Sequence, residues 1–187
     1  TNQICIPCRN REGELIGIRC RNLDPERLET AKYIPLITLD GQSYAFPTNQ
    51  VFYGINYTWE AIERTGQVLI VESEKGVMKA NEFLGRDNNC VALYGSQLGL
   101  KRRNEIIKMG VKDVVLCLDS DFVGLDTPEY DKFEKKMFDI AKQFKGYCNV
   151  SVVYNNIGLE NWNKCSPFDG TKEQWNMLYD NREAVEG

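Results

Sequence analysis

The sequence contains no histidine among its 187 residues. This absence excludes every mechanism that uses imidazole as a general base or as a metal ligand. The sequence also lacks the GxxxxGK[ST] loop of P-loop ATPases, and no apolar run approaches the roughly 20 residues that cross a bilayer. No secretory signal is present, so we expect a cytoplasmic protein with no membrane partner.

The overall composition is that of a folded, water-soluble chain. Hydrophobic residues make up 42% of the sequence and charged residues 27%, which excludes an intrinsically disordered protein. The net charge of −4 excludes a protein that coats nucleic acid by bulk electrostatics. Local basic stretches still leave room for phosphate contacts, because acidic site residues lower the total charge.

Seven cysteines are present, and their odd number without a secretory signal indicates reduced thiols in a cytoplasmic setting. Cys5 and Cys8 have the CxxC spacing of a zinc site. No second such pair follows, and no histidine exists to complete four ligands. We therefore expect no zinc in this chain.

Two short apolar segments end abruptly in carboxylates. Glu72 follows Val68–Val71, and Asp119 and Asp121 follow Val114–Leu118. Because the carboxyl ends of parallel strands share one edge of a sheet, we expect these carboxylates to lie together. Either segment alone is explained by a strand that ends in a polar loop. The pair predicts a site for Mg²⁺ or Mn²⁺, which oxygen ligands suit.

The remaining pattern predicts an α/β fold with a parallel sheet of about four strands flanked by helices. A β-hairpin over residues 3–21, with its turn at Asn10–Gly13, precedes that sheet, and residues 22–50 read as loop with short extended pieces. The predicted strands after the hairpin are 68–72, 90–93, 114–118 and 148–154. The predicted helices are 58–64 (capped by Thr58), 77–84, 100–109, 130–144 and 172–179.

The acidic segments also carry a resemblance to a known domain. Val71-Glu72, followed some 45 residues later by Leu118-Asp119-Ser120-Asp121, resembles the TOPRIM domain of primases, topoisomerases and some nucleases. The spacer segment Val91–Ser96 resembles the second strand of that domain and the glycine-containing turn after it. Phe122–Asp126 resembles the run that follows the paired aspartates in DnaG-type primases.

The N-terminal region narrows the resemblance to DnaG-type primases of bacteria and phages. The hairpin, the Lys32-Tyr33 pair, Phe46 and Phe52-Tyr53-Gly54 resemble the segment before the TOPRIM part of those primases. TOPRIM nucleases and topoisomerases do not carry this run. The resemblance implies an incomplete primase-core subdomain over residues 1–65, a TOPRIM domain over 66–157, and a C-terminal tail with a short helix over 158–187.

The resemblance implies a nucleotidyltransferase that makes short RNA primers from ribonucleoside triphosphates on single-stranded DNA. It assigns catalysis to Glu72, Asp119 and Asp121. It assigns the metal to these three residues and to one more loosely matched aspartate: Glu72, Asp119, Asp121, Asp169. It assigns DNA or nucleotide binding to five cations: Arg9, Arg21, Lys32, Lys101, Arg102. Cations in the first turn of the 100–109 helix oppose the helix dipole, and phosphate contact and an exposed face explain them equally well.

The chain departs from the primase pattern at several positions. Ser73 replaces a glycine, Gly76 an aspartate, and Thr48 a lysine. Glu74 is able to compensate for Gly76 or to face solvent. The chain begins at Thr1, and the zinc-binding and helicase-interacting regions of primases are missing. We therefore expect a fragment of a larger primase of phage type, contacting the replicative helicase through absent regions, whose activity in isolation is doubtful.

Two alternatives stay open at the level of sequence. One is a TOPRIM nuclease or topoisomerase-like enzyme that cleaves DNA with the same metals. The other is a non-catalytic, nucleic-acid-binding relative, which Gly76 and Thr48 favour. Neither the initiation sequence nor the oligomeric state follows from the residues.

Overall fold

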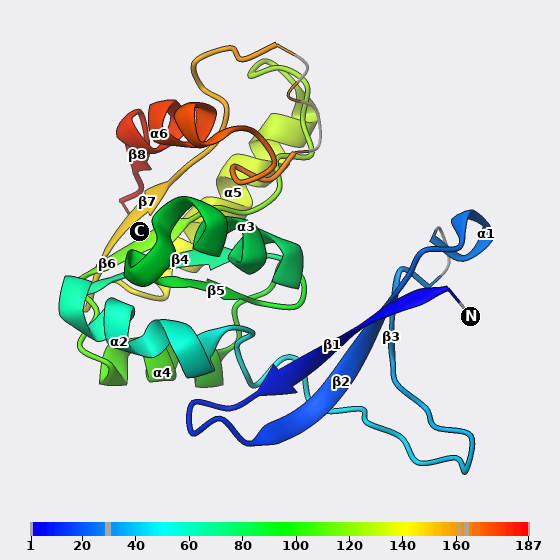
Figure 1. The fold of residues 1–187 in the computed structure, drawn as a ribbon. Coiled ribbons are helices and arrows are strands. Elements are labelled where there is room, and N and C mark those ends of the chain that lie inside the picture. Colours follow the sequence, from blue (N-terminus) through cyan, green and yellow to red (C-terminus); the bar gives the residue numbers. More distant parts are fainter. Residues whose placement is uncertain (1, 29–30, 161, 163–164, 187) are drawn as a thin grey trace.

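The computed structural model describes residues 2–28, 31–160, 162 and 165–186. Two β-sheets organise the chain, and the smaller one projects away from the main body (Figure 1). The elements in chain order are β1 (Gln3–Arg9), β2 (Leu15–Asn22), α1 (Pro25–Leu28), β3 (Tyr33–Pro35), α2 (Ile55–Thr65), β4 (Gln67–Val71), α3 (Glu74–Leu84), a 3₁₀ turn (Gly85–Asp87), β5 (Cys90–Ala92), α4 (Leu100–Lys108), β6 (Asp113–Leu116), α5 (Pro128–Lys142), β7 (Asn149–Val152), α6 (Lys172–Asp180) and β8 (Glu183–Ala184).

The smaller sheet is the predicted hairpin with a third strand added. β1 and β2 pair antiparallel, and β3 pairs antiparallel with β2. The hairpin turn is closed by the Asn10 side chain, whose Oδ1 accepts a hydrogen bond from the Glu14 amide at 2.8 Å. Gly13 has a φ of 85°, a conformation that costs a residue without a Cβ little.

The larger sheet has the strand order β5-β4-β6-β7-β8. The first four strands are parallel, because helices connect them and return the chain to the same end of the sheet. The central strands are apolar on both faces, as strands covered on two sides must be. β8 is antiparallel to β7 and forms one edge.

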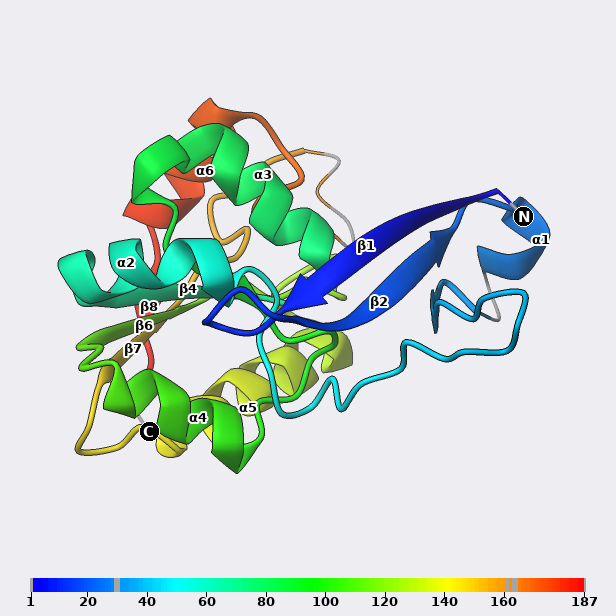
Figure 2. The same ribbon diagram turned by 60° about the horizontal axis from the view of Figure 1, so that its bottom comes forward.

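Helices cover both faces of this sheet (Figure 2). One face carries Val68 and Ile70 and packs against α2, α4 and α5. The opposite face carries Leu69 and Val71 and packs against α3 and α6. Among the described residues, no helix is long and apolar enough to cross a membrane.

Three details differ from the sequence-based expectations. α2 begins at Ile55, so Thr58 is a buried residue inside the helix and caps nothing; the N-cap is Gly54, at a φ of 89°. The larger sheet has five strands where about four were expected. The fifth, β8, has only two residues and no apolar pattern that would predict a strand. The region after residue 158 contributes Phe168 and Trp175 to the core, so it is part of the folded body. The divisions at residues 65/66 and 157/158 both stay predictions.

A buried ion pair joins the smaller sheet to helix α3, which packs on the larger sheet. Arg19 of β2 donates from Nη1 to Oε1 of Glu74 at 2.9 Å, and Glu74 is fully buried at the start of α3. The Arg19 guanidinium also lies over the rings of Tyr33 and Tyr94. Burial raises the pKa of Glu74, and the charge of Arg19 opposes that rise. The smaller sheet is therefore fixed to the larger one by a charge that would be costly to leave unpaired.

We predict that Arg19→Met lowers the free energy of unfolding by about 3–5 kcal/mol near pH 7, because it leaves the Glu74 carboxylate buried without its cation. A carboxyl whose folded pKa lies above its unfolded value loses stability as pH rises, so the deficit should shrink at acidic pH. Urea unfolding at several pH values measures both effects. The control is Arg64→Met, which removes an exposed pair with Asp87 and should cost below about 1 kcal/mol. A small or pH-independent loss at Arg19 would contradict the prediction.

Candidate metal centre

The acidic segments leave the sheet side by side. β4 and β6 are paired in parallel, with Ile70 opposite Leu116, so both strands end at the same edge of the sheet. Glu72 directly follows β4, and Asp119 and Asp121 lie in the loop after β6. The expected juxtaposition is present because the parallel register fixes it.

Asp169 reaches the same edge from the C-terminal region. The Ser120 amide donates to the Cys165 carbonyl at 3.2 Å, which fixes residues 165–169 beside the loop after β6. Asp169 also has a local role, since its Oδ2 accepts from the Ser166 amide at 3.1 Å within a turn. Both interpretations of this aspartate, turn former and member of the acidic group, agree with the structure.

The charges of three neighbouring carboxylates act on Asp119. The pKa of Asp119 rises from an ordinary 3.8 to about 6. Partial burial is the largest cause, and the negative charges of Glu72, Asp169 and Asp121 follow in that order. Lys32 partly opposes the rise. We call Glu72, Asp119, Asp121 and Asp169 the acidic cluster.

Two lysines already neutralise part of the acidic cluster. Lys136 of α5 binds Oε1 of Glu72 at 2.9 Å, and Lys75 of α3 binds Oδ1 of Asp169 at 2.5 Å. Within the described part of the chain, no three acidic or cysteine side chains converge in a ready metal-coordinating arrangement. The carboxylates are thus neighbours within Coulombic reach, and one oxygen each of Glu72 and Asp169 is paired with an ammonium group. Their all-oxygen donor set suits Mg²⁺ or Mn²⁺.

A cavity of about 190 Å³ opens beside the acidic cluster, between the loop after β6 and α5. Its lining mixes both charge signs around one aromatic ring: Asp119, Asp121, Glu129, Lys132, Phe133, Lys136. From the sequence we expect a helix over 130–144, with no functional role for its lysines. The available signal was their four-residue spacing beside the apolar stripe, which places Lys132 and Lys136 on one side of the helix.

The five predicted basic residues lie in different parts of the structure. Lys32 lies within Coulombic reach of the acidic cluster, since its charge lowers the pKa of Asp119. Arg21 donates to the Tyr33 hydroxyl at 2.9 Å, and its charge acts on Glu74. Arg21 lies on the same face of β2 as Arg19, which contacts the main body.

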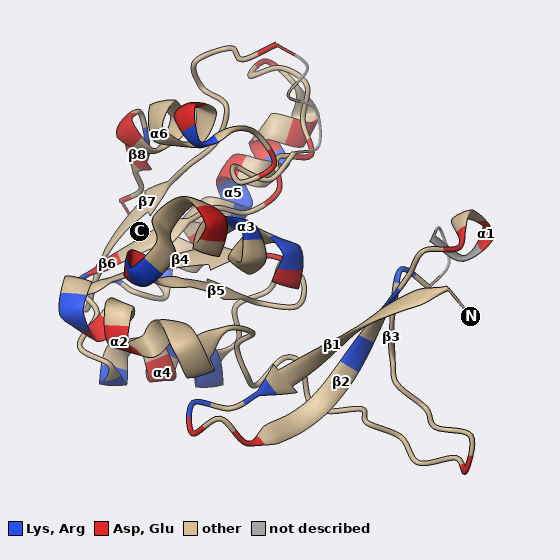
Figure 3. Cartoon of the chain, viewed as in Figure 1, with Lys and Arg blue, Asp and Glu red and all other residues tan. Residues whose placement is uncertain are grey.

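Arg9 and Lys101 lie elsewhere. Arg9 donates to the Gly13 carbonyl at 2.7 Å, within the hairpin turn. Lys101 donates to Oε1 of Gln50 at 3.1 Å and lines a cavity formed by the hairpin turn, α2 and α4. Figure 3 shows Lys and Arg interspersed with Asp and Glu over α3, α4 and α5, in agreement with the small net charge.

The assignment of Arg102 to phosphate binding is wrong. Its side chain is only 2% exposed. Its guanidinium donates to the carbonyls of Leu93, Gln97 and Thr48, the last at 3.2 Å. Arg102 therefore supports the loops around α4. These three carbonyl oxygens explain why a cation is stable in the first turn of the helix without a phosphate.

Glu74 does not replace the acidic residue missing at Gly76. It is buried against Arg19, and its paired oxygen is used by that guanidinium. Gly76 itself packs on β4: a Cβ there would lie 2.9 Å from Cγ2 of Val71. An aspartate at position 76 would need Val71 or the start of α3 to shift, so this close packing accompanies the loss of that carboxylate.

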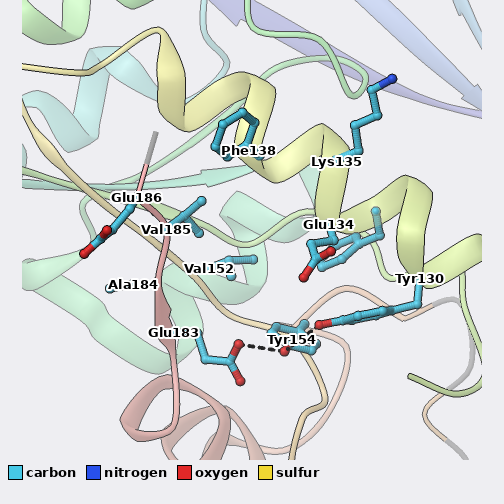
Figure 4. Close-up of a pocket in the computed structure, with 11 residues that line it drawn as sticks. Tyr130, Glu134, Lys135, Phe138, Val152, Tyr154, Glu183, Ala184, Val185 and Glu186 are labelled. Atoms are coloured by element: carbon cyan, nitrogen blue, oxygen red, sulfur yellow. Dashed lines mark hydrogen bonds between the residues drawn. The ribbon is translucent and has the colours of Figure 1, made fainter. Parts of the chain in front are cut away.

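A larger groove lies on another side of α5, away from the acidic cluster. It has a volume of about 370 Å³ and runs between α5 and the edge strand β8 (Figure 4). The Tyr154 hydroxyl donates to Glu183 at 2.8 Å and lies 3.2 Å from the Tyr130 hydroxyl. These groups satisfy one another, and we assign the groove no chemistry.

Comparison with known proteins bears on the fold. No family model matches the chain. The chain is 33% identical over 181 residues to the SPbeta prophage-derived uncharacterized protein YorJ of Bacillus subtilis (strain 168), a match that covers 92% of this chain and 47% of that protein. The chain thus spans about half the length of the curated relative it matches.

Solved primase structures are similar over nearly the whole chain. The Aquifex aeolicus primase (zinc-binding and RNA polymerase domains) has a TM-score of 0.70 at 19% identity, covering 98% of this chain and 41% of that one. The RNA polymerase domain of Mycobacterium tuberculosis DnaG has a TM-score of 0.68 at 18% identity, covering 96% and 55%. A DnaG catalytic domain bound to single-stranded DNA has a TM-score of 0.61 at 18% identity, covering 98% and 52%. The predicted resemblance is confirmed at the level of fold: the chain has the architecture of the DnaG primase catalytic core.

We predict that Asp119→Asn stabilises the metal-free protein by about 1–2 kcal/mol at pH 7, a value reduced for solvent screening. Because the folded pKa of Asp119 is raised, the wild type should lose stability as pH rises from about 4 to about 6. The variant should lack that loss. Thermal unfolding in EDTA across pH 4–8 measures the difference, with Asp139→Asn on the exposed side of α5 as the charge-matched control. A lower melting temperature for Asp119→Asn would contradict the prediction.

Proposed function

We propose that the chain is the catalytic core of a DnaG-type primase, which synthesises short RNA primers from ribonucleoside triphosphates on single-stranded DNA. The observation that supports this most is the acidic cluster at the carboxyl edge of two paired parallel strands, in a chain with the primase fold. Open α/β sheets bind their ligands at this edge. We propose Glu72, Asp119 and Asp121 as the catalytic residues.

Nucleotidyl transfer requires positioning and charge neutralisation more than covalent help from protein groups. Mg²⁺ or Mn²⁺ held at the acidic cluster would neutralise charge on the phosphates. Glu72, Asp119, Asp121 and Asp169 would hold the metal, and the partial burial of Asp119 would limit the access of competing water. In this proposal Lys32 and Arg21, which belong to the N-terminal segment that forms the smaller sheet, bind phosphates of the template or nucleotide.

The known structures agree with a role on DNA. One similar DnaG catalytic domain was solved bound to single-stranded DNA, and the M. tuberculosis RNA polymerase domain in complex with double-stranded DNA. The prophage origin of the curated relative agrees with a phage-type primase. Contact with a replicative helicase and a cytoplasmic location belong to the same proposal, for the whole protein of which this chain is the core.

A second candidate is a non-catalytic relative that binds nucleic acid. It is favoured by Gly76, where the packing on Val71 leaves no room for a carboxylate, and by the lysines already bound to Glu72 and Asp169. Binding of DNA that is unchanged by chelation of divalent metal, together with no primer synthesis, would support this candidate.

The proposed function predicts that Asp119→Asn and Glu72→Gln each reduce primer synthesis by at least about 100-fold, because each removes a metal ligand. The measurement is incorporation of labelled ribonucleotides on a single-stranded DNA template with Mg²⁺ or Mn²⁺, in the full-length protein. Asp139→Asn should retain activity. A nicking assay on the same preparations separates primase from nuclease: cleavage without synthesis would replace the proposal.

Arg21→Ala should weaken binding of single-stranded DNA and reduce its salt dependence. Each lost phosphate contact lowers the slope of log affinity against log salt by about 0.7, because fewer counterions are released. Salt titrations of DNA affinity for wild type, Arg21→Ala and the control Arg64→Ala measure the slopes. Equal slopes for Arg21→Ala and wild type would mean that Arg21 contacts no phosphate.

A further inference from the structure

The side of α5 that faces the acidic cluster is charged where a packing surface would be apolar. Glu129, Lys132, Phe133 and Lys136 follow the spacing of one helical side, and all four line the cavity that also contains Asp119 and Asp121. The packing of α5 on the sheet uses Phe133, Met137, Ile140 and Ala141, so Phe133 alone is shared between the two. The two lysines therefore have no part in the apolar packing of this helix.

Lys136 is held in one orientation at a cost. Its ammonium group binds Glu72 at 2.9 Å while the two side chains are 31% and 19% exposed. Fixing a lysine costs rotamer freedom, and partial burial costs hydration. The compensation is the repulsion that this cation relieves in the acidic cluster. Lys136 thus stands where positive charge is needed.

A divalent cation and the Lys136–Glu72 pair compete for the same negative charge. A metal bound by Glu72 would place two positive charges close to an ammonium group, and like charges at this distance repel. Lys136 would then leave Glu72. Because its stem is fixed on α5, the freed ammonium would remain in the cavity beside Asp121 and Lys132, next to the metal.

We propose that Lys136 and Lys132 form a subsite for the phosphate groups of a metal-bound triphosphate, and that Lys136 neutralises Glu72 until the metal arrives. This inference rests on the proposed function, because it takes Glu72 and Asp119 as metal ligands. Ammonium groups bind phosphate as compact point charges, without the planar geometry that a guanidinium requires. The ligand class is a polyphosphate chain carried in with its divalent ion.

The two roles of Lys136 predict effects of opposite sign. Lys136→Met removes the competitor, so Mn²⁺ alone should bind about three- to tenfold more tightly. The same change removes a phosphate contact, so inorganic tripolyphosphate at saturating Mn²⁺ should bind about tenfold more weakly. Lys132→Met should weaken tripolyphosphate binding without tightening Mn²⁺ binding, because Lys132 has no ion pair with the acidic cluster among the described contacts.

The experiment measures free Mn²⁺ by electron paramagnetic resonance and tripolyphosphate binding by calorimetry, with circular dichroism to verify folding. The matched control is Lys135→Met, which removes a neighbouring charge from the other groove of α5 (Figure 4). Lys136→Arg keeps the cation and should restore most of the tripolyphosphate affinity. It serves as the second variant if Lys136→Met is unstable.

Tighter Mn²⁺ binding together with weaker tripolyphosphate binding supports the inference. Unchanged or weaker Mn²⁺ binding in Lys136→Met, or an effect equal to that of Lys135→Met, overturns it, as does a wild type that binds no Mn²⁺. Neither measurement needs primer synthesis. If Lys136→Met binds Mn²⁺ more tightly and tripolyphosphate more weakly but the wild type makes no primers, the proposed function alone is refuted. If the wild type makes primers but Lys136→Met changes neither affinity, the inference alone is refuted.

Discussion

Repulsion among carboxylates at one edge of a parallel sheet is the constraint on which the site depends. Glu72 and Asp119 leave paired strands at the same edge, and the turn before α6 adds Asp169. Such a cluster is stable only if positive charge accompanies it. The fold supplies this charge with lysines from helices on both faces of the sheet: Lys136 from α5 and Lys75 from α3.

A second electrostatic contact positions the smaller sheet relative to α3. The buried Arg19–Glu74 pair fixes the three-stranded sheet to the start of α3. This attachment brings Lys32 close enough to act on Asp119.

The primase fold and the departures from the primase pattern have to be considered together. The architecture matches solved primase cores over almost the entire chain at 15–19% identity, which shows the fold. The packing of Gly76 against Val71 and the use of Glu74 as a structural ion leave fewer carboxylates for metal than the primase pattern has. Lys136 and Lys75 are bound to two of the remaining carboxylates, Glu72 and Asp169.

Much of this protein followed from local sequence. Short β-branched runs separated by amphipathic helices predicted the parallel sheet, because period and chain connectivity are local properties. The proximity of Glu72 to Asp119 followed too, since the ends of neighbouring parallel strands must share an edge. The hairpin was readable from its turn residues, Asn10 and Gly13.

Other features depended on partners distant in the sequence. Arg102 looks like any exposed cation in a first helical turn until the carbonyls of Thr48 and Leu93 are seen to surround it. β8 has two residues and exists only because β7 offers a free edge. Lys136 meets Glu72 across 64 positions of sequence. Charge and hydrogen-bond partners at such separations are set by the packing of elements, which no local pattern encodes, so the tertiary structure alone decided which cations serve the fold and which stand beside the carboxylates.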